Sequence, residues 1–155
     1  MNRVRAPGST ISPKSTRAST LAGVSPAATS EPFKTTIAPW LAVNDAQKAA
    51  DFYTAAFGAV EVYRLEGDDG KVAVAQLAVD GAAFWVQQDS ESESAHGSTS
   101  VRMILSVEDP NSAYDQAVAA GATEVAPVSE EYGWRTGRVT DPFGYDWELS
   151  RQLTQ

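Results

Sequence analysis

Asp-Pro-Phe-Gly-Tyr-Asp-Trp-Glu-Leu, residues 141–149, is the stretch of this sequence that decides the fold. Pro142 fixes φ at the second position of a turn, and Gly144 can take a positive φ just beyond it. The following residues alternate as in a half-buried strand, with Asp146 and Glu148 on one face and Trp147 on the other. Glu148 is therefore a candidate metal ligand, a candidate general base or a solvated charge, and the rest of the chain has to decide between these roles.

The same order of elements occurs twice in the chain. In the first copy we expect a strand over 37–43, a helix over 46–57, and strands near 59–66, 71–79 and 82–88. The second copy predicts a strand over 101–107, a helix over 112–120, and strands near 123–128, 134–140 and 144–151. Asn44 or Asp45 can cap the first helix and Gly58 can end it, while Gly121 closes the second helix.

The two copies can be aligned at a nearly constant offset. Residues 41–45 align with 105–109 at an offset of 64, Gly58 aligns with Gly121 at 63, and Trp85 aligns with Trp147 at 62. Single-residue drift at loops is typical of a duplicated module with small deletions. The pattern predicts an α+β fold built from two tandem βαβββ modules.

Composition limits the classes of function. The chain has 155 residues with 43% hydrophobic content, enough for one sizeable core. No apolar run approaches the roughly 18 residues of a membrane span, so we expect no membrane role. The first 30 residues hold four of the 12 basic residues and none of the 20 acidic ones, which leaves a net charge of about −12 on the remainder. Such a surface repels phosphates, so we expect no nucleic-acid binding.

Metal-binding residue types are scarce. Cysteine is absent and His96 is the one histidine, whereas zinc and iron sites usually use several imidazoles or thiolates. His96 falls in a polar connector, residues 89–100, which shows no periodicity. Residues 1–32 are rich in Ser, Thr, Ala and Pro, and we predict a disordered basic tail. This tail fits either a dispensable extension of a cytoplasmic protein or an organelle transit peptide.

Residues 33–155 resemble the vicinal oxygen chelate superfamily, which includes glyoxalases, bleomycin resistance proteins and extradiol dioxygenases. The likeness rests on the closing Asp-Pro-Phe-Gly turn with Trp-Glu-Leu, and on 51–53, 57–59 and 119–122. It covers modules 33–88 and 101–152, and this chain is closest in type to uncharacterised glyoxalase-like members. The resemblance implies that the modules form a cupped mixed sheet around a small-molecule ligand, and that the protein is a homodimer.

In metal-dependent members the resemblance places the metal ligands on the first and last strand of each module. Projected through the repeat, these positions are Ala38, Val86, Arg102 and Glu148, of which only Glu148 can bind a metal. We therefore expect no metal and no cofactor. Arg102 and Glu148 project onto facing positions, so we expect an ion pair in place of the metal, which either orients a polar group of the ligand or only neutralises charge at the cavity mouth.

Strand alternation predicts which side chains face the cavity. We expect Trp40, Phe84, Arg102, Ile104, Asp146 and Glu148 there, with Ala38, Ala42, Val86 and Ser106. The helix-facing set is Leu41, Val43, Trp85, Met103, Leu105, Val107, Trp147 and Leu149. Trp134 and Arg135 are predicted at the cavity rim, where Trp134 either stacks on a ligand or packs on its own connector.

Three functions remain open at this point. The first is a metal-free protein that binds a small organic molecule, such as a metabolite or an antibiotic. The second is a lyase or isomerase of the glyoxalase type, either metal-independent with Glu148 as the base or metal-dependent with other ligands. The third is a purely structural role.

Overall fold

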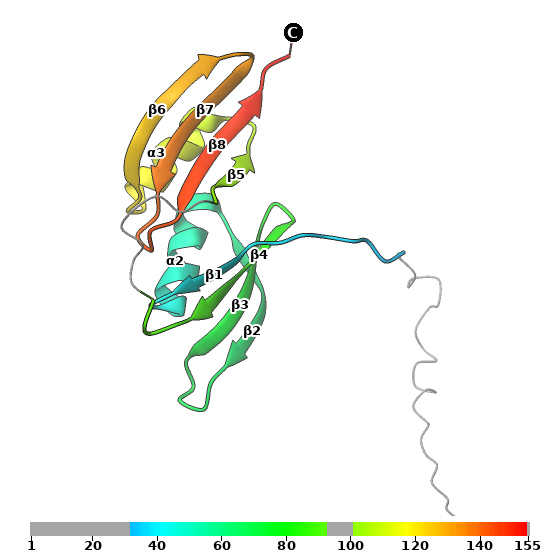
Figure 1. Cartoon of the computed structure of the whole chain (residues 1–155), viewed down its shortest axis with the longest axis vertical. Helices are drawn as coiled ribbons and strands as arrows, with labels where there is room; N and C mark the ends of the chain where they lie inside the picture. Colours follow the sequence, from blue (N-terminus) through cyan, green and yellow to red (C-terminus); the bar gives the residue numbers. More distant parts are fainter. Residues whose placement is uncertain (1–31, 93–100, 155) are drawn as a thin grey trace, which may run out of the picture. The chain divides into compact units, whose positions relative to one another are not determined.

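Each repeat of the sequence forms one four-stranded sheet and one helix in the computed structural model, which describes residues 32–92 and 101–154 (Figure 1). The first module contains β1 (Trp40–Val43), α2 (Ala46–Phe57), β2 (Val60–Glu66), β3 (Val72–Val79) and β4 (Ala82–Gln88). The second contains β5 (Met103–Ser106), α3 (Pro110–Ala119), β6 (Thr123–Glu131), β7 (Trp134–Thr140) and β8 (Asp146–Gln152). The predicted tail, His96 and most of the connector lie outside the described residues.

The two sheets have the same topology. Their strand orders are β1-β4-β3-β2 and β5-β8-β7-β6. The first and last strand of each module pair in parallel, and the remaining neighbours pair antiparallel. A parallel pair at the same place in each mixed sheet is the expected result of a duplicated module, so the predicted α+β class with two βαβββ modules is confirmed.

Several strand boundaries differ from the expectations, and pairing explains the differences in β1, β5 and β6. β1 begins at Trp40 rather than residue 37, because its ladder with β4 starts at the pair Trp40–Trp85. β5 covers only Met103–Ser106, the residues that pair with β8. β6 runs on to Glu131, which pairs with Trp134 across a tight turn whose Tyr132 and Gly133 both have positive φ.

Both helices begin at the acidic residues of the repeated motif. Asp45 accepts a hydrogen bond from the Lys48 backbone amide, and Asp109 accepts from two backbone amides of the first turn of α3. These side chains satisfy amides that have no partner within the helix. Gly58 ends α2 in the left-handed conformation at φ 72°, as predicted, whereas α3 ends at Ala119 before Gly121.

An aromatic cluster forms the centre of the core and draws on both modules. Tyr53 of α2 is fully buried, and its ring lies 5.1 Å from that of Phe84 and 5.5 Å from that of Trp147. Phe57 and Phe143 also contact Tyr53. Because Trp147 and Phe143 come from the second module, α2 packs against both modules and fixes one to the other.

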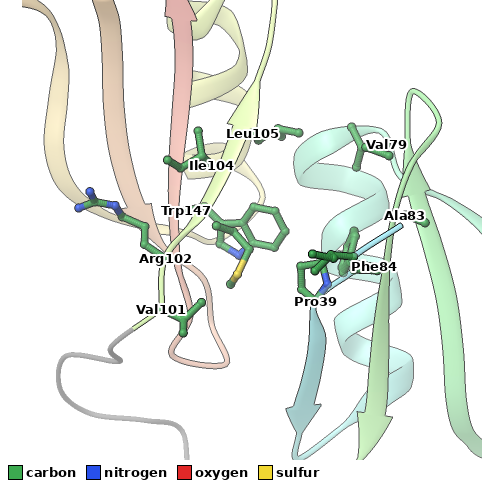
Figure 2. Close-up of a pocket in the computed structure, with 13 residues that line it drawn as sticks. Pro39, Val79, Ala83, Phe84, Val101, Arg102, Ile104, Leu105 and Trp147 are labelled. Atoms are coloured by element: carbon green, nitrogen blue, oxygen red, sulfur yellow. The ribbon is translucent and has the colours of Figure 1, made fainter. Parts of the chain in front are cut away.

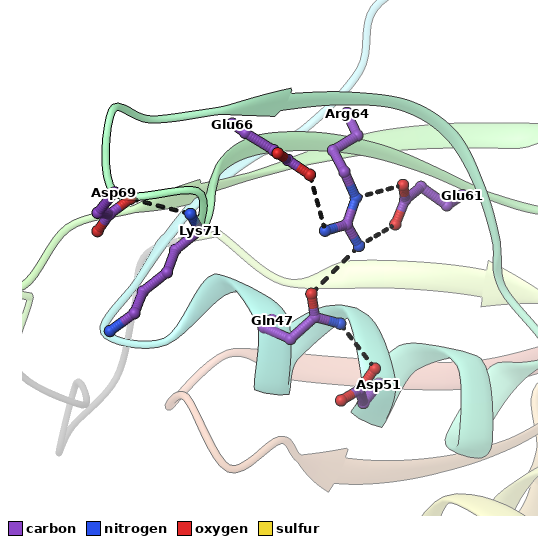
Figure 3. Close-up of polar contacts among 7 residues, drawn as sticks. All are labelled: Gln47, Asp51, Glu61, Arg64, Glu66, Asp69 and Lys71. Atoms are coloured by element: carbon purple, nitrogen blue, oxygen red, sulfur yellow. Dashed lines mark hydrogen bonds and ion pairs between the residues drawn. The ribbon is translucent and has the colours of Figure 1, made fainter.

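The outer edge of the first sheet is tied to α2 by a polar network (Figure 3). Arg64 of β2 donates to Glu61 at 2.7 Å and to Gln47 of α2 at 3.1 Å. Gln47 in turn donates to Asp51 at 3.0 Å, one turn along the helix. The contacts are exposed, so they orient the strand edge while contributing little to stability.

Candidate functional site

The turn at Asp141 joins the modules through a buried carboxylate. Asp141 accepts a 2.5 Å hydrogen bond from the Tyr53 hydroxyl and a 2.9 Å bond from Trp147 Nε1. It also accepts from the backbone amides of Phe143 and Tyr145, both at 2.9 Å. Sequence reasoning assigned Asp141 only to a turn, although an aspartate directly before Pro-Phe-Gly has the geometry to accept from amides of its own turn.

Burial sets the ionisation of this cluster. It raises the pKa of Asp141 above its ordinary value, and the hydrogen bonds that Asp141 accepts oppose that rise. Burial, and then the neighbouring Asp141 charge, raise the pKa of Tyr53 well above 10.0. Asp141 is enclosed on all sides by protein groups, so we assign it to holding the modules together rather than to contact with a ligand.

The closing strand carries a polar cluster on its other face. Glu148 Oε2 lies 2.9 Å from Arg102 Nε, and Glu148 Oε1 accepts a 2.9 Å hydrogen bond from Thr136. The carboxylate is mostly covered, with 19% of its side chain exposed, whereas Arg102 is 44% exposed. The structure therefore brings together the two residues that the repeat had projected onto facing positions, and both carboxylate oxygens have partners.

In the second module, the side chains alternate between the two faces of the sheet as predicted, except at Arg135. Ile104 pairs with Glu148 and is 60% exposed, and Asp146 accepts a 2.7 Å hydrogen bond from Thr140 on the same face. Trp134 shares this face and is 40% exposed. Arg135 does not join them. It lies on the opposite face of β7, where it pairs with Glu130 through a 2.9 Å contact of its Nε, because adjacent residues in a strand point to opposite sides.

In the first module the prediction for β4 is wrong by one residue, so the side chains that were expected on the cavity face lie on the helix face and the reverse. Phe84 is 4% exposed and Val86 is fully buried, both on the helix side. Trp85, which was predicted to face the helix, stacks instead on Trp40 with ring centroids 5.7 Å apart. Leu41 and Leu105 occupy the same position in the two modules. Leu41 pairs with Val86 and Leu105 pairs with Leu149, so Val86 corresponds to Leu149. The preceding residue, Trp85, therefore corresponds to Glu148.

The corrected register reveals an aromatic surface on the first sheet. Tyr63 of β2 approaches Trp85 edge-on at 5.9 Å, next to the Trp40–Trp85 stack. Gln87 accepts a 2.8 Å hydrogen bond from Trp40 Nε1 and holds the indole in place. Trp40 is 53% exposed, so the stack presents a flat apolar surface with its polar atom already bonded. Sequence reasoning found Trp40 but missed Trp85 and Tyr63.

A pocket of about 510 Å³ opens where the starts of β1 and β5 approach each other (Figure 2). Pro39 and Phe84 line it from the first module, and Val101, Ile104 and Trp147 line it from the second. The Trp147 and Phe84 rings, 5.5 Å apart, form its floor. Arg102 lies at the edge with its guanidinium directed away from Phe84, so the interior of the pocket is almost wholly apolar.

The four positions at which the resemblance places a metal do not have residues that fit one. After the register correction they are Ala38, Trp85, Arg102 and Glu148, which supply one carboxylate, one cation and no imidazole. Within residues 32–92 and 101–154, no three His, Cys, Asp or Glu side chains gather closely enough to hold an ion. A guanidinium at 2.9 Å from Glu148 also takes the place that a cation would need.

These features define a two-module α+β protein with aromatic and charged side chains on its exposed sheet faces. The sequence model of the Glyoxalase/Bleomycin resistance protein/Dioxygenase superfamily matches residues 34–149. The chain therefore belongs to this superfamily. No helix in the described part of the chain is long and apolar enough to cross a bilayer.

Two relatives of known sequence are uncharacterised proteins. An uncharacterised protein of Mycobacterium tuberculosis is 36% identical over 128 residues, which span 77% of this chain and 75% of the relative. One from Arabidopsis thaliana is 33% identical over 126 residues, with 71% and 75% covered.

Solved structures support the fold. TioX from Micromonospora sp. ML1 superposes with a TM-score of 0.64 at 28% identity, covering 77% of this chain and all of TioX. The fosfomycin resistance protein FosX from Listeria monocytogenes gives 0.61 at 16% identity, with 79% and 96% covered, and is evidence for the fold alone.

Proposed function

We propose that this protein binds a small organic molecule without a metal ion, using the exposed faces of its two sheets. The observation that carries the proposal is the replacement at the metal positions, where Arg102 pairs with the one carboxylate, Glu148, and Trp85 stacks on Trp40. The pair of Arg102 and Glu148 supplies a polar anchor, and the Trp40–Trp85 stack supplies a surface for a planar group.

A thermal-shift screen of metabolites and antibiotics tests this function, because a ligand that binds the folded state raises the midpoint of unfolding. We expect a stabilising compound whose effect is lost in Trp85→Ala and kept in Tyr132→Ala, since Tyr132 is an exposed aromatic residue at a turn of the other module. Metal analysis of protein purified without chelator is the complementary test, and stoichiometric zinc, nickel, manganese or iron would overturn the metal-free proposal.

An enzymatic function is the second candidate, and the place of Glu148 favours it. The Glu148 side chain is 19% exposed on the sheet face that carries the exposed Ile104, and a carboxylate there could remove a proton from a molecule bound to this face. Against this role, Thr136 and Arg102 occupy both oxygens. Product formation that disappears in Glu148→Gln, while ligand binding is retained, would establish the enzyme. Binding without turnover in both proteins would support the binding function alone.

We further propose that the functional form is a homodimer, in which a second copy covers exposed apolar residues of the sheets. The described residues of β2 include Val60, Val62 and Leu65, which are between 49% and 61% exposed. Apolar side chains gathered on one strand favour burial against a partner. We propose a cytoplasmic location, with targeting by the N-terminal tail as the alternative. Fluorescent fusions of the full chain and of residues 33–155 would distinguish the two.

A further inference from the structure

Arg138 is a cation of the polar face whose Nε atom has no partner in the described part of the chain. It lies on β7, where its neighbours across the sheet are Glu148 on β8 and Ala126 on β6. Its Nε atom is buried and has no hydrogen-bond partner among the described residues. A buried charged donor without a partner is costly, so its retention in a folded protein calls for an explanation.

The acids next to Arg138 are bonded to other groups. Glu148 uses one oxygen for Thr136 and the other for Arg102, each at 2.9 Å. Asp146, one step along the same face, accepts from Thr140 at 2.7 Å. Arg138 thus stands beside two carboxylates without an ion pair to either in the described part of the chain.

The neighbour of Arg138 on the other side is small and uncharged. Ala126, its neighbour on β6, has a small uncharged side chain. Arg138 is half-buried, so part of its side chain reaches solvent on the face that also carries the exposed Trp134. The planar guanidinium of an arginine can bind two oxygens of one group at once.

We propose that Arg138 binds an oxyanion of the ligand, a carboxylate or a phosphate. This inference rests on the proposed binding function and adds the charge of the ligand to it. Glu148 and Arg102 neutralise each other, so the second arginine is the group that selects an anionic compound over a neutral one of the same shape.

The test compares three probes of one shape, namely benzoate, phenyl phosphate and neutral benzamide, titrated into the full-length protein in phosphate-free buffer. The reporter is the arginine Nε–H region of ¹⁵N NMR spectra, in which Arg138→Gln identifies the Arg138 signal. Arg135→Gln is the matched control, because Arg135 lies on the same strand with its side chain on the opposite face. Circular dichroism verifies that both variants are folded.

We expect one or both anions to move the Arg138 signal, and the anion that does so identifies the oxyanion. Affinity for it should fall about tenfold or more in Arg138→Gln and remain unchanged in Arg135→Gln. An Arg138 signal that neither anion moves would overturn the inference, whatever benzamide does. So would equal binding of all three probes to wild type and Arg138→Gln, although the proposed binding function would then stand. The proposed binding function has its own test: it is refuted if the compound screen, with neutral and anionic molecules, finds no ligand.

Discussion

Asp141 is a buried residue that serves the fold within a motif that also carries a candidate site residue. Its carboxylate receives donors from α2, from its own turn and from β8, so three separate pieces of chain depend on it. Glu148, seven residues later, points to the open face. The motif therefore combines a structural acid and a candidate functional acid, and only the first is fully enclosed.

Replacing Asp141 with Asn should destabilise the protein strongly. An amide group supplies one acceptor and turns two donors toward groups that are themselves donors, leaving buried hydrogens unpaired. We expect the free energy of unfolding to fall by about 1–3 kcal/mol, measured by urea denaturation. Asp115→Asn on the exposed surface of α3 is the control and should change it little. A loss no larger than in this control would contradict the assigned role.

Ionisation of Tyr53 should limit stability in alkali. Its folded-state pKa is raised well above 10.0 by burial, so the folded state keeps the phenol proton that the unfolded state releases. The associated stability is present below pH 10 and is lost as the pH rises through the folded-state value. We expect the midpoint of thermal unfolding to fall steeply above pH 10.

The comparison for this pH effect is Tyr53→Phe, which should be less stable at neutral pH but should lose less stability in alkali. Tyr145 also has a raised pKa, caused first by burial, so some alkaline loss should persist in the variant. Equal alkaline slopes in the two proteins would show that Tyr53 does not titrate as proposed. The pKa of Asp141 is also raised, so its protonated form contributes to the stability of the folded state at acid pH. That contribution is lost as the pH rises through the folded-state pKa of Asp141.

Among the elements, helices and turns were the most predictable from sequence. α2 begins after Asp45 and ends at Gly58 as expected, because helix caps and residues in the left-handed backbone conformation depend on local residue types. The face of β4 was not predictable from the matched tryptophans, Trp85 and Trp147. Gly58 and Gly121 align at an offset of 63 residues. Had the same offset been applied to the last strand of each module, Phe84 would have aligned with Trp147, and Trp85 would have been predicted on the exposed face. Strand phase depends on pairing between distant residues, and a shift of one residue reverses it.

The contact between α3 and β7 depends on the absence of a side chain at Gly137. A Cβ built there would lie 2.7 Å from Val128 Cγ2 and 2.9 Å from Tyr114 Cδ2, closer than packed atoms tolerate. Gly137→Ala should therefore lower the free energy of unfolding by about 1–3 kcal/mol. The double variant with Val128→Ala should recover part of this loss, because it removes the nearest obstacle. Absence of recovery would place the clash on Tyr114 alone.

At the scale of the whole molecule, the sequence predicted the duplication and the superfamily, and it also predicted that Arg102 and Glu148 would meet. It did not predict the junction of the modules, which uses side-chain contacts across long separations. Tyr145 donates to the Ala42 carbonyl at 2.7 Å, and Gln116 of α3 donates to the Ala55 carbonyl of α2 at 2.9 Å. Tyr145 belongs to the closing motif and Gln116 to α3, but nothing in the residues around either one indicates a partner in the first module, so sequence patterns gave no signal for these bonds.

One substitution among the exposed apolar residues of β2 should change the assembly state of the protein. If a second copy covers Leu65, which is 49% exposed in the single chain, then Leu65→Lys places a charge in an apolar contact and should dissociate the dimer. Light scattering after size exclusion should give twice the mass of one chain for wild type and one chain for the variant. Lys48→Glu on the exposed surface of α2 is the control and should remain dimeric. If the second copy completes the binding surface, the monomeric variant should also bind the screened ligand more weakly. Because association stabilises the folded state, the variant should unfold at a lower temperature in the absence of ligand. A wild-type protein that is monomeric at every concentration measured would refute the proposed dimer, and a monomer with full ligand affinity would place the binding site within one chain.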